Sequence, residues 1–158
     1  MKRLLALTLI ATCILLGISC SNTSKAAPPD YIKDVVSYQE GTDAIVIYFV
    51  LADSNGVETS ASGSVHLRIV QEETNYLTDR TTTTTLYDRT FNVKASDFHK
   101  TTVGQGAFAR ERLICSFGRI AYDQFYTYPS GDFPSGKIIV DFTTESGRVL
   151  TGSDTILY

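Results

Sequence analysis

The chain has few of the residues that small proteins use for cross-links and metal sites. Its 158 residues include three cysteines, two histidines and no tryptophan. Cys13 and Cys20 lie near the N-terminus, which leaves only Cys115 for the rest of the chain, so an internal disulfide is excluded there. Two isolated histidines do not supply the three or four ligands of a zinc site. The sequence therefore predicts no metal, no cofactor, and a fold held together by its apolar core.

Clusters of positive charge are also missing. Lysine and arginine number 14 against 17 aspartate and glutamate residues, and nowhere do four or more basic residues cluster. The charge balance therefore argues against a nucleic-acid partner, and the lack of a basic cluster argues against adhesion to anionic lipid through a basic patch.

The first twenty residues form a segment of their own. Lys2 and Arg3 are followed by an apolar run over residues 4–18, and then by Ser19 and Cys20. The end of this segment, Leu16-Gly17-Ile18-Ser19-Cys20, resembles the lipobox of bacterial lipoproteins. The resemblance implies cleavage after Ser19, a diacylglyceryl thioether on Cys20, and a position in the cell envelope, lipid-anchored on the extracytoplasmic side of a membrane. Cys13 fits less well, because Thr12 before it is bulkier than Ser19.

Two other interpretations of this segment compete with the lipoprotein one. An uncleaved membrane anchor would need about 20 apolar residues, and the run over 4–18 is shorter. A plain secretory signal is the alternative that stays open, since residues 11–19 also offer small side chains. The lipoprotein interpretation predicts a helix over residues 4–18 that is detached from the folded part.

The lipoprotein interpretation divides the chain into three segments: a signal peptide over 1–19, a lipidated cysteine with a flexible tether over 20–30, and a folded domain over 31–158. The tether consists mostly of small and polar residues and contains two prolines. Without Lys2 and Arg3 the mature chain has 12 basic and 17 acidic residues, a net charge of -5. Its remaining 139 residues fit one domain.

Hydrophobic side chains in the folded part recur with a period of two. Residues 64–70 alternate, which predicts that Val65, Leu67 and Ile69 face the core while His66 and Arg68 face outward. Further strands are expected over 31–38, 44–52, 85–95, 107–117, 137–144 and 148–158. Single helical turns or corners are expected over 95–100, with Ser96 as the cap, and over 120–125.

About seven short strands joined by turns predict an all-β protein, namely a two-sheet antiparallel sandwich of immunoglobulin-like type. The tryptophan and cysteine pair of antibody domains are absent, so this prediction depends on pattern. A small open barrel and a transthyretin-like sandwich are the alternatives.

The residues that could form a catalytic site are better explained by a structural role than by catalysis. Asp97, His99 and Cys115 could supply a carboxylate, a base and a thiol. However, Cys115 shares a strand face with Leu113 and Phe117, where a free cysteine behaves as a small buried hydrophobe. Without a nucleophile motif, the chain is predicted not to be an enzyme.

The segment over 122–134 is the candidate binding site. It places aromatic residues among turn-formers, and tyrosine is enriched in recognition surfaces. The residues proposed to contact a partner are Tyr122, Tyr126, Tyr128 and Phe133. The alternative is that these rings plug the open end of the sandwich. The threonine run over 81–85 is expected to be a solvated strand or loop edge.

Three function hypotheses result. The first is a noncatalytic envelope lipoprotein that binds a protein or glycan through loop aromatics. The second is a structural or assembly accessory of a membrane complex, and the third, with least support, is an enzyme.

Overall fold

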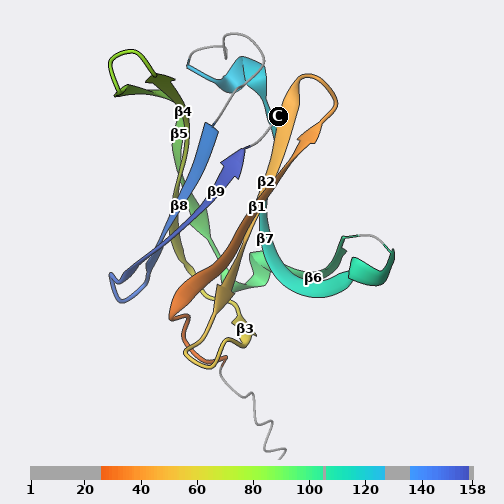
Figure 1. Cartoon of the computed structure of the whole chain (residues 1–158). Coiled ribbons are helices and arrows are strands. Elements are labelled where there is room, and N and C mark those ends of the chain that lie inside the picture. Colours follow the sequence, from red (N-terminus) through yellow and green to blue (C-terminus); the bar gives the residue numbers. More distant parts are fainter. Residues whose placement is uncertain (1–25, 105, 127–135, 157–158) are drawn as a thin grey trace, which may run out of the picture.

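Two antiparallel β-sheets face each other in the computed structural model, which describes residues 26–104, 106–126 and 136–156 (Figure 1). The first sheet has the order β1-β2-β7-β6, with β3 also paired to β2, and the second has the order β5-β4-β8-β9. The strands are β1 (Tyr31–Glu40), β2 (Ala44–Ala52), β3 (Glu58–Thr59), β4 (Gly63–Asn75), β5 (Arg80–Val93), β6 (Phe98–Val103), β7 (Arg110–Ala121), β8 (Gly136–Thr144) and β9 (Val149–Ile156). The predicted all-β architecture of two antiparallel sheets is confirmed.

The described residues hold nine strands rather than about seven, for local reasons. β3 has only two residues, too few to show a period. The expected corner over 95–100 is a 3-10 turn, η1 (Ala95–Asp97), followed directly by strand β6. Its N-cap residue is Lys94, whose N–H donates to the Asp97 carboxylate at 2.8 Å, so Ser96 as the cap was wrong.

Two further short helical turns flank β7. The strand expected over 107–117 begins at Arg110, because η2 (Gly106–Phe108) precedes it. The helical turn expected over 120–125 is present as η3 (Tyr122–Gln124). The expected helix over 4–18 and Cys20 lie outside the described residues. No helix in the described ranges has the length and apolar character needed to cross a membrane.

Alternation in β4 places side chains as predicted. Val65, Leu67 and Ile69 are fully buried between the sheets, and His66 and Arg68 lie on the opposite, half-exposed face. All nine residues of β2 are buried. β1 and β7 cover its two edges, one face packs in the core between the sheets, and Tyr48 and Val50 on the other face pack with Ile114. Burying one such aliphatic side chain stabilises the fold by about 1.5–3 kcal/mol.

Phe49 of β2 lies at the centre of the core. Its ring contacts Phe98, Phe117 and Phe142, with centroids 5.5, 5.5 and 6.1 Å away, so it joins both sheets. Cys115 is buried in this same core, as predicted. Burial, together with the charge of Asp97, raises the pKa of its thiol to about 12.

The sandwich has two ends with different connections (Figure 1). At one end, which we call the tether end, residues 26–30 run irregularly along the domain. Two hydrogen bonds hold this segment: Thr59 Oγ1 donates to Ala27 O at 2.7 Å, and Asp30 N donates to Ala52 O at 2.7 Å. Pro29, between them, is buried. The opposite, distal end carries the β1–β2 turn, the β4–β5 hairpin and η3.

Candidate functional site

The residues predicted to contact a partner differ in how far they are exposed to solvent. Tyr122 is buried, with 6% of its surface exposed, whereas Tyr126 is 66% exposed. Tyr128, Phe133 and the predicted lipidation residue Cys20 lie outside the described residues. Tyr126 is therefore the member of the predicted set for which the structure shows a ring open to solvent.

The segment over 122–126 closes the distal end of the sandwich. Tyr122 N donates to Asp43 O of the β1–β2 turn at 2.8 Å, which fixes the start of the segment to the first sheet. Tyr126 N donates to Leu86 O of β5 at 2.7 Å, which fixes its end to the second sheet. The five residues thus bridge the two sheets.

The inward-facing rings of this bridge plug the core. The ring of Phe125 contacts those of Tyr122 and Tyr87, at centroid distances of 5.4 and 5.8 Å. Burial raises the pKa of Tyr87, against the opposing effect of Arg89, whose guanidinium lies 5.4 Å from the ring centroid. Tyr122 and Phe125 are therefore structural, and their rings plug the open end of the sandwich.

Tyr126 is anchored although its ring is exposed. Its hydroxyl donates to Asp88 O at 2.7 Å, two residues along β5 from the Leu86 carbonyl that accepts from its N–H. These two bonds occupy the outer edge of β5 and fix the ring beside it. A fixed, exposed aromatic ring can contact a partner with little loss of conformational entropy.

A β-hairpin arm, residues Glu72–Thr85, projects next to this segment. Pairing of β4 with β8 ends at Gln71↔Gly136, whereas pairing of β4 with β5 continues to Asn75↔Arg80. Every residue of the arm is exposed, and its tip presents Tyr76 and Leu77 with 92% and 97% of their surfaces exposed. The expected solvated strand over 81–85 is confirmed as part of this arm.

Among the described residues, one strand edge of the arm has no pairing partner. Beyond their pairing with β4, residues 80–85 make no further main-chain hydrogen bond among the described residues. The stretch lacks proline and lysine, which commonly protect edges. A two-stranded ribbon whose residues are all exposed is marginally stable, so contact with a partner would stabilise it.

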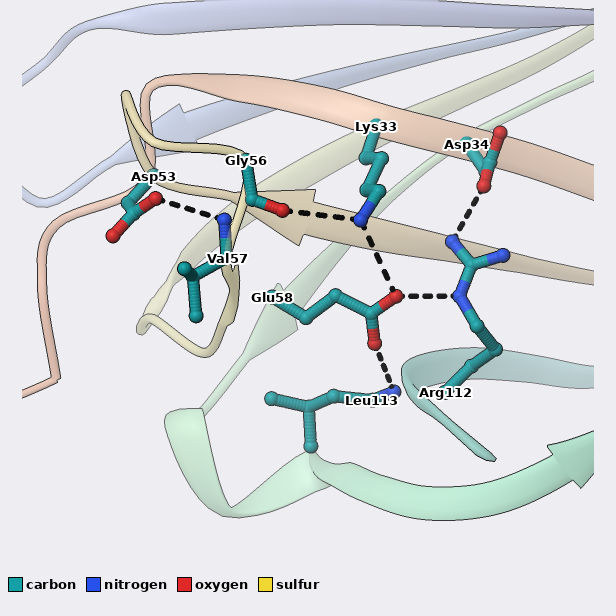
Figure 2. Close-up of polar contacts among 8 residues, drawn as sticks. All are labelled: Lys33, Asp34, Asp53, Gly56, Val57, Glu58, Arg112 and Leu113. Carbon is teal, nitrogen blue, oxygen red and sulfur yellow. Dashed lines mark hydrogen bonds and ion pairs between the residues drawn. The ribbon is translucent and has the colours of Figure 1, made fainter. Parts of the chain in front are cut away.

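A polar network covers the outer face of the first sheet near the tether end. Arg112 of β7 contacts Asp34 of β1 and Glu58 of β3, each at 2.5 Å, and Glu58 also accepts from Leu113 N at 2.7 Å (Figure 2). Lys33 lies 3.8 Å from the same carboxylate. Burial alone would raise the pKa of Glu58, but the hydrogen bonds from Leu113 and Arg112 hold it below the usual 4.5. Because these groups satisfy one another, the network holds β3 to the sheet.

The candidate catalytic groups are not brought together. Cys115 faces the core, whereas His99 is exposed, and its Nδ1 lies 3.3 Å from Asp97 O. His66 pairs with Asp88 at 2.7 Å on the outer face of the second sheet. In the part of the chain that the structure describes, no group of three or more histidine, cysteine or acidic residues could hold a metal ion.

Sequence reasoning missed the arm and the Arg112 network. The threonine run over 81–85 was the one available signal for the arm, and the exposure of this run was expected. The arm projects because β8 begins only at Gly136, opposite Gln71 of β4, and this start could not be predicted from the threonine run. Comparison with protein-family models, with curated proteins and with solved structures finds no match to this chain.

Proposed function

We propose that this chain is a noncatalytic lipoprotein of the cell envelope, anchored through Cys20, whose sandwich binds a partner at its distal end. Lipidation of Cys20 is proposed from the lipobox resemblance. The comparison with immunoglobulin-like modules is likewise a proposal and depends on architecture, namely two antiparallel sheets with loops gathered at the ends.

One observation carries the proposal: the tether joins one end of the sandwich, and the most exposed apolar side chains lie at the other (Figure 1). Tyr76, Leu77 and Tyr126 are between 66% and 97% exposed at the distal end. An anchor on Cys20 would turn this end away from the bilayer. Exposed aromatic and aliphatic residues on projecting loops are typical of recognition surfaces.

Site-specific photocrosslinking in intact cells tests the binding surface. A photoreactive residue at Leu77 or at Tyr126 should give an adduct of one defined mass. The matched control is Asn92, which is exposed one residue before the end of β5 that lies away from the arm. Adducts of the same mass from all three positions, or from none, would contradict the proposal. Digestion of the adduct with a protease or a glycan hydrolase distinguishes a protein from a glycan.

The open edge of β5 favours the accessory hypothesis as the second candidate. A strand of a larger complex could pair with residues 80–85 by β-augmentation. Thr83→Pro removes one main-chain N–H from this strand. If the accessory hypothesis holds, this substitution should abolish the adduct from Leu77, while Tyr126→Ala should leave that adduct in place.

A further inference from the structure

Three exposed apolar residues lie on segments next to the point where the tether joins the domain. Val57, Val149 and Tyr31 are 61%, 57% and 41% exposed. Tyr31 directly follows Asp30, and Val149 follows Arg148, whose guanidinium contacts the Asp30 carboxylate at 2.7 Å and the Asp30 main-chain oxygen at 2.8 Å.

Hydrogen bonds place Val57 beside the same point. Its N–H donates to the Asp53 carboxylate at 2.9 Å, and the neighbouring Ala52 carbonyl accepts from Asp30 N at 2.7 Å. The three residues therefore lie on segments that meet where the tether joins the domain, namely the start of β1, the turn before β3 and the start of β9.

The length of the tether limits how far this surface can lie from a lipid on Cys20. The domain holds the chain from Ala27 onward, through the hydrogen bond from Thr59 and the burial of Pro29. Cys20 is seven residues before Ala27, a separation of at most about 25 Å when fully extended. The tether end would therefore stay within this distance of the bilayer, and the arm would point away from it.

The local charges determine which kind of lipid surface fits. Arg148 is paired with Asp30, and Lys33 donates to Gly56 O at 3.0 Å and lies 3.8 Å from Glu58. These cations already have partners, so they do not form a free basic patch for anionic lipid. A zwitterionic headgroup layer, which accepts apolar side chains without requiring net positive charge, matches this surface better.

We propose that the tether end docks on a zwitterionic bilayer surface, with Val57 and Val149 in the headgroup layer. This inference builds on the lipid anchor of the proposed function. Docking at this end would hold the sandwich upright and present Tyr76, Leu77 and Tyr126 to partners.

Single-tryptophan fluorescence tests the docking, because the chain has no tryptophan of its own. The mature chain, residues 20–158, is prepared without lipid, and its Cys20 thiol is coupled to a maleimide lipid in phosphatidylcholine vesicles. Cys115 does not compete for the maleimide, because it is buried and its pKa is raised to about 12. Val57→Trp and Val149→Trp are the reporters, and Leu77→Trp at the tip of the arm is the matched control.

Brominated acyl chains in the vesicles should quench the fluorescence of Val57→Trp and Val149→Trp, whose emission should also shift to shorter wavelength. Leu77→Trp should keep its full intensity. Unquenched reporters, or equal quenching of the control, would overturn the inference. Chemical coupling replaces native lipidation, so a failure of docking here is distinct from a failure of the proposed anchor.

Discussion

The hydroxyl oxygen of Tyr126 lies 2.7 Å from the main-chain oxygen of Asp88 and donates a hydrogen bond to it, which fixes an exposed ring to the edge of β5. A few residues earlier, along the arm, no other described segment pairs with this edge. The distal end therefore combines an anchored aromatic ring with a projecting hairpin that offers apolar side chains and, within the part of the chain that the structure describes, a strand edge without a further main-chain partner.

Tyr126→Ala should weaken partner capture with little effect on stability. The ring is mostly exposed, so the main loss is one hydrogen bond, worth about 1 kcal/mol. In a domain of this size that corresponds to a fall of a few degrees, roughly 2–4 °C, in Tm. Thermal unfolding followed by circular dichroism measures it.

Phe125→Ala is the paired variant, one residue earlier in the same bridge. Its ring is buried against Tyr122 and Tyr87, and truncating a buried phenylalanine costs about 3–5 kcal/mol. Urea denaturation should show a much lower midpoint than for Tyr126→Ala. Equal losses in the two variants would mean that the 126 ring also belongs to the core.

Stability should fall in acid partly through Glu58. Its pKa in the folded state lies below the usual 4.5, so the contribution of its charge to the free energy of unfolding is complete above about pH 4.5 and is lost as the pH falls further. The urea midpoint of the wild type should therefore drop more between pH 6 and pH 3 than that of Glu58→Gln. Parallel curves would show that the network with Arg112 adds no stability.

Gly152→Ala should destabilise the contact between β9 and β1. A Cβ atom at residue 152 would lie 2.6 Å from Ile32 Cγ2 and 3.0 Å from Val35 Cγ2, both in the core. Overpacking of this kind costs about 1–3 kcal/mol. Ser153→Ala, at the next position of β9, is the control, and urea denaturation of the two variants should separate them by that amount.

Strands with buried apolar residues were predicted well from the sequence, and exposed polar strands were not. Strand β2 was predicted from 44 to 52, as observed, because nine apolar residues are bounded by turn residues at both ends. The end of β4 was missed, because Glu72 to Asn75 carry no hydrophobic period and pair only with the equally polar start of β5. A hydrophobic period arises where one face of a strand is buried, and the residues of the arm are all exposed.

Contacts between distant residues lay beyond pattern reasoning altogether. Arg112 meets Asp34, 78 residues away, only after the register of β1 shifts between Ile32 and Asp34. No local signal marks such a bulge. For the same reason, the sequence could group the aromatics over 122–134 but could not tell that Tyr122 turns inward while Tyr126 stays outside.

The anchor on Cys20 is the claim on which the orientation of the whole molecule depends. Metabolic labelling with a radioactive fatty acid, followed by membrane fractionation, measures it most directly. Cys13→Ser is the matched control, because it removes the other cysteine of the same segment. The account predicts label and membrane association in the wild type and in Cys13→Ser, and neither in Cys20→Ser. Label that persists in Cys20→Ser, or that never enters the wild type, would contradict it.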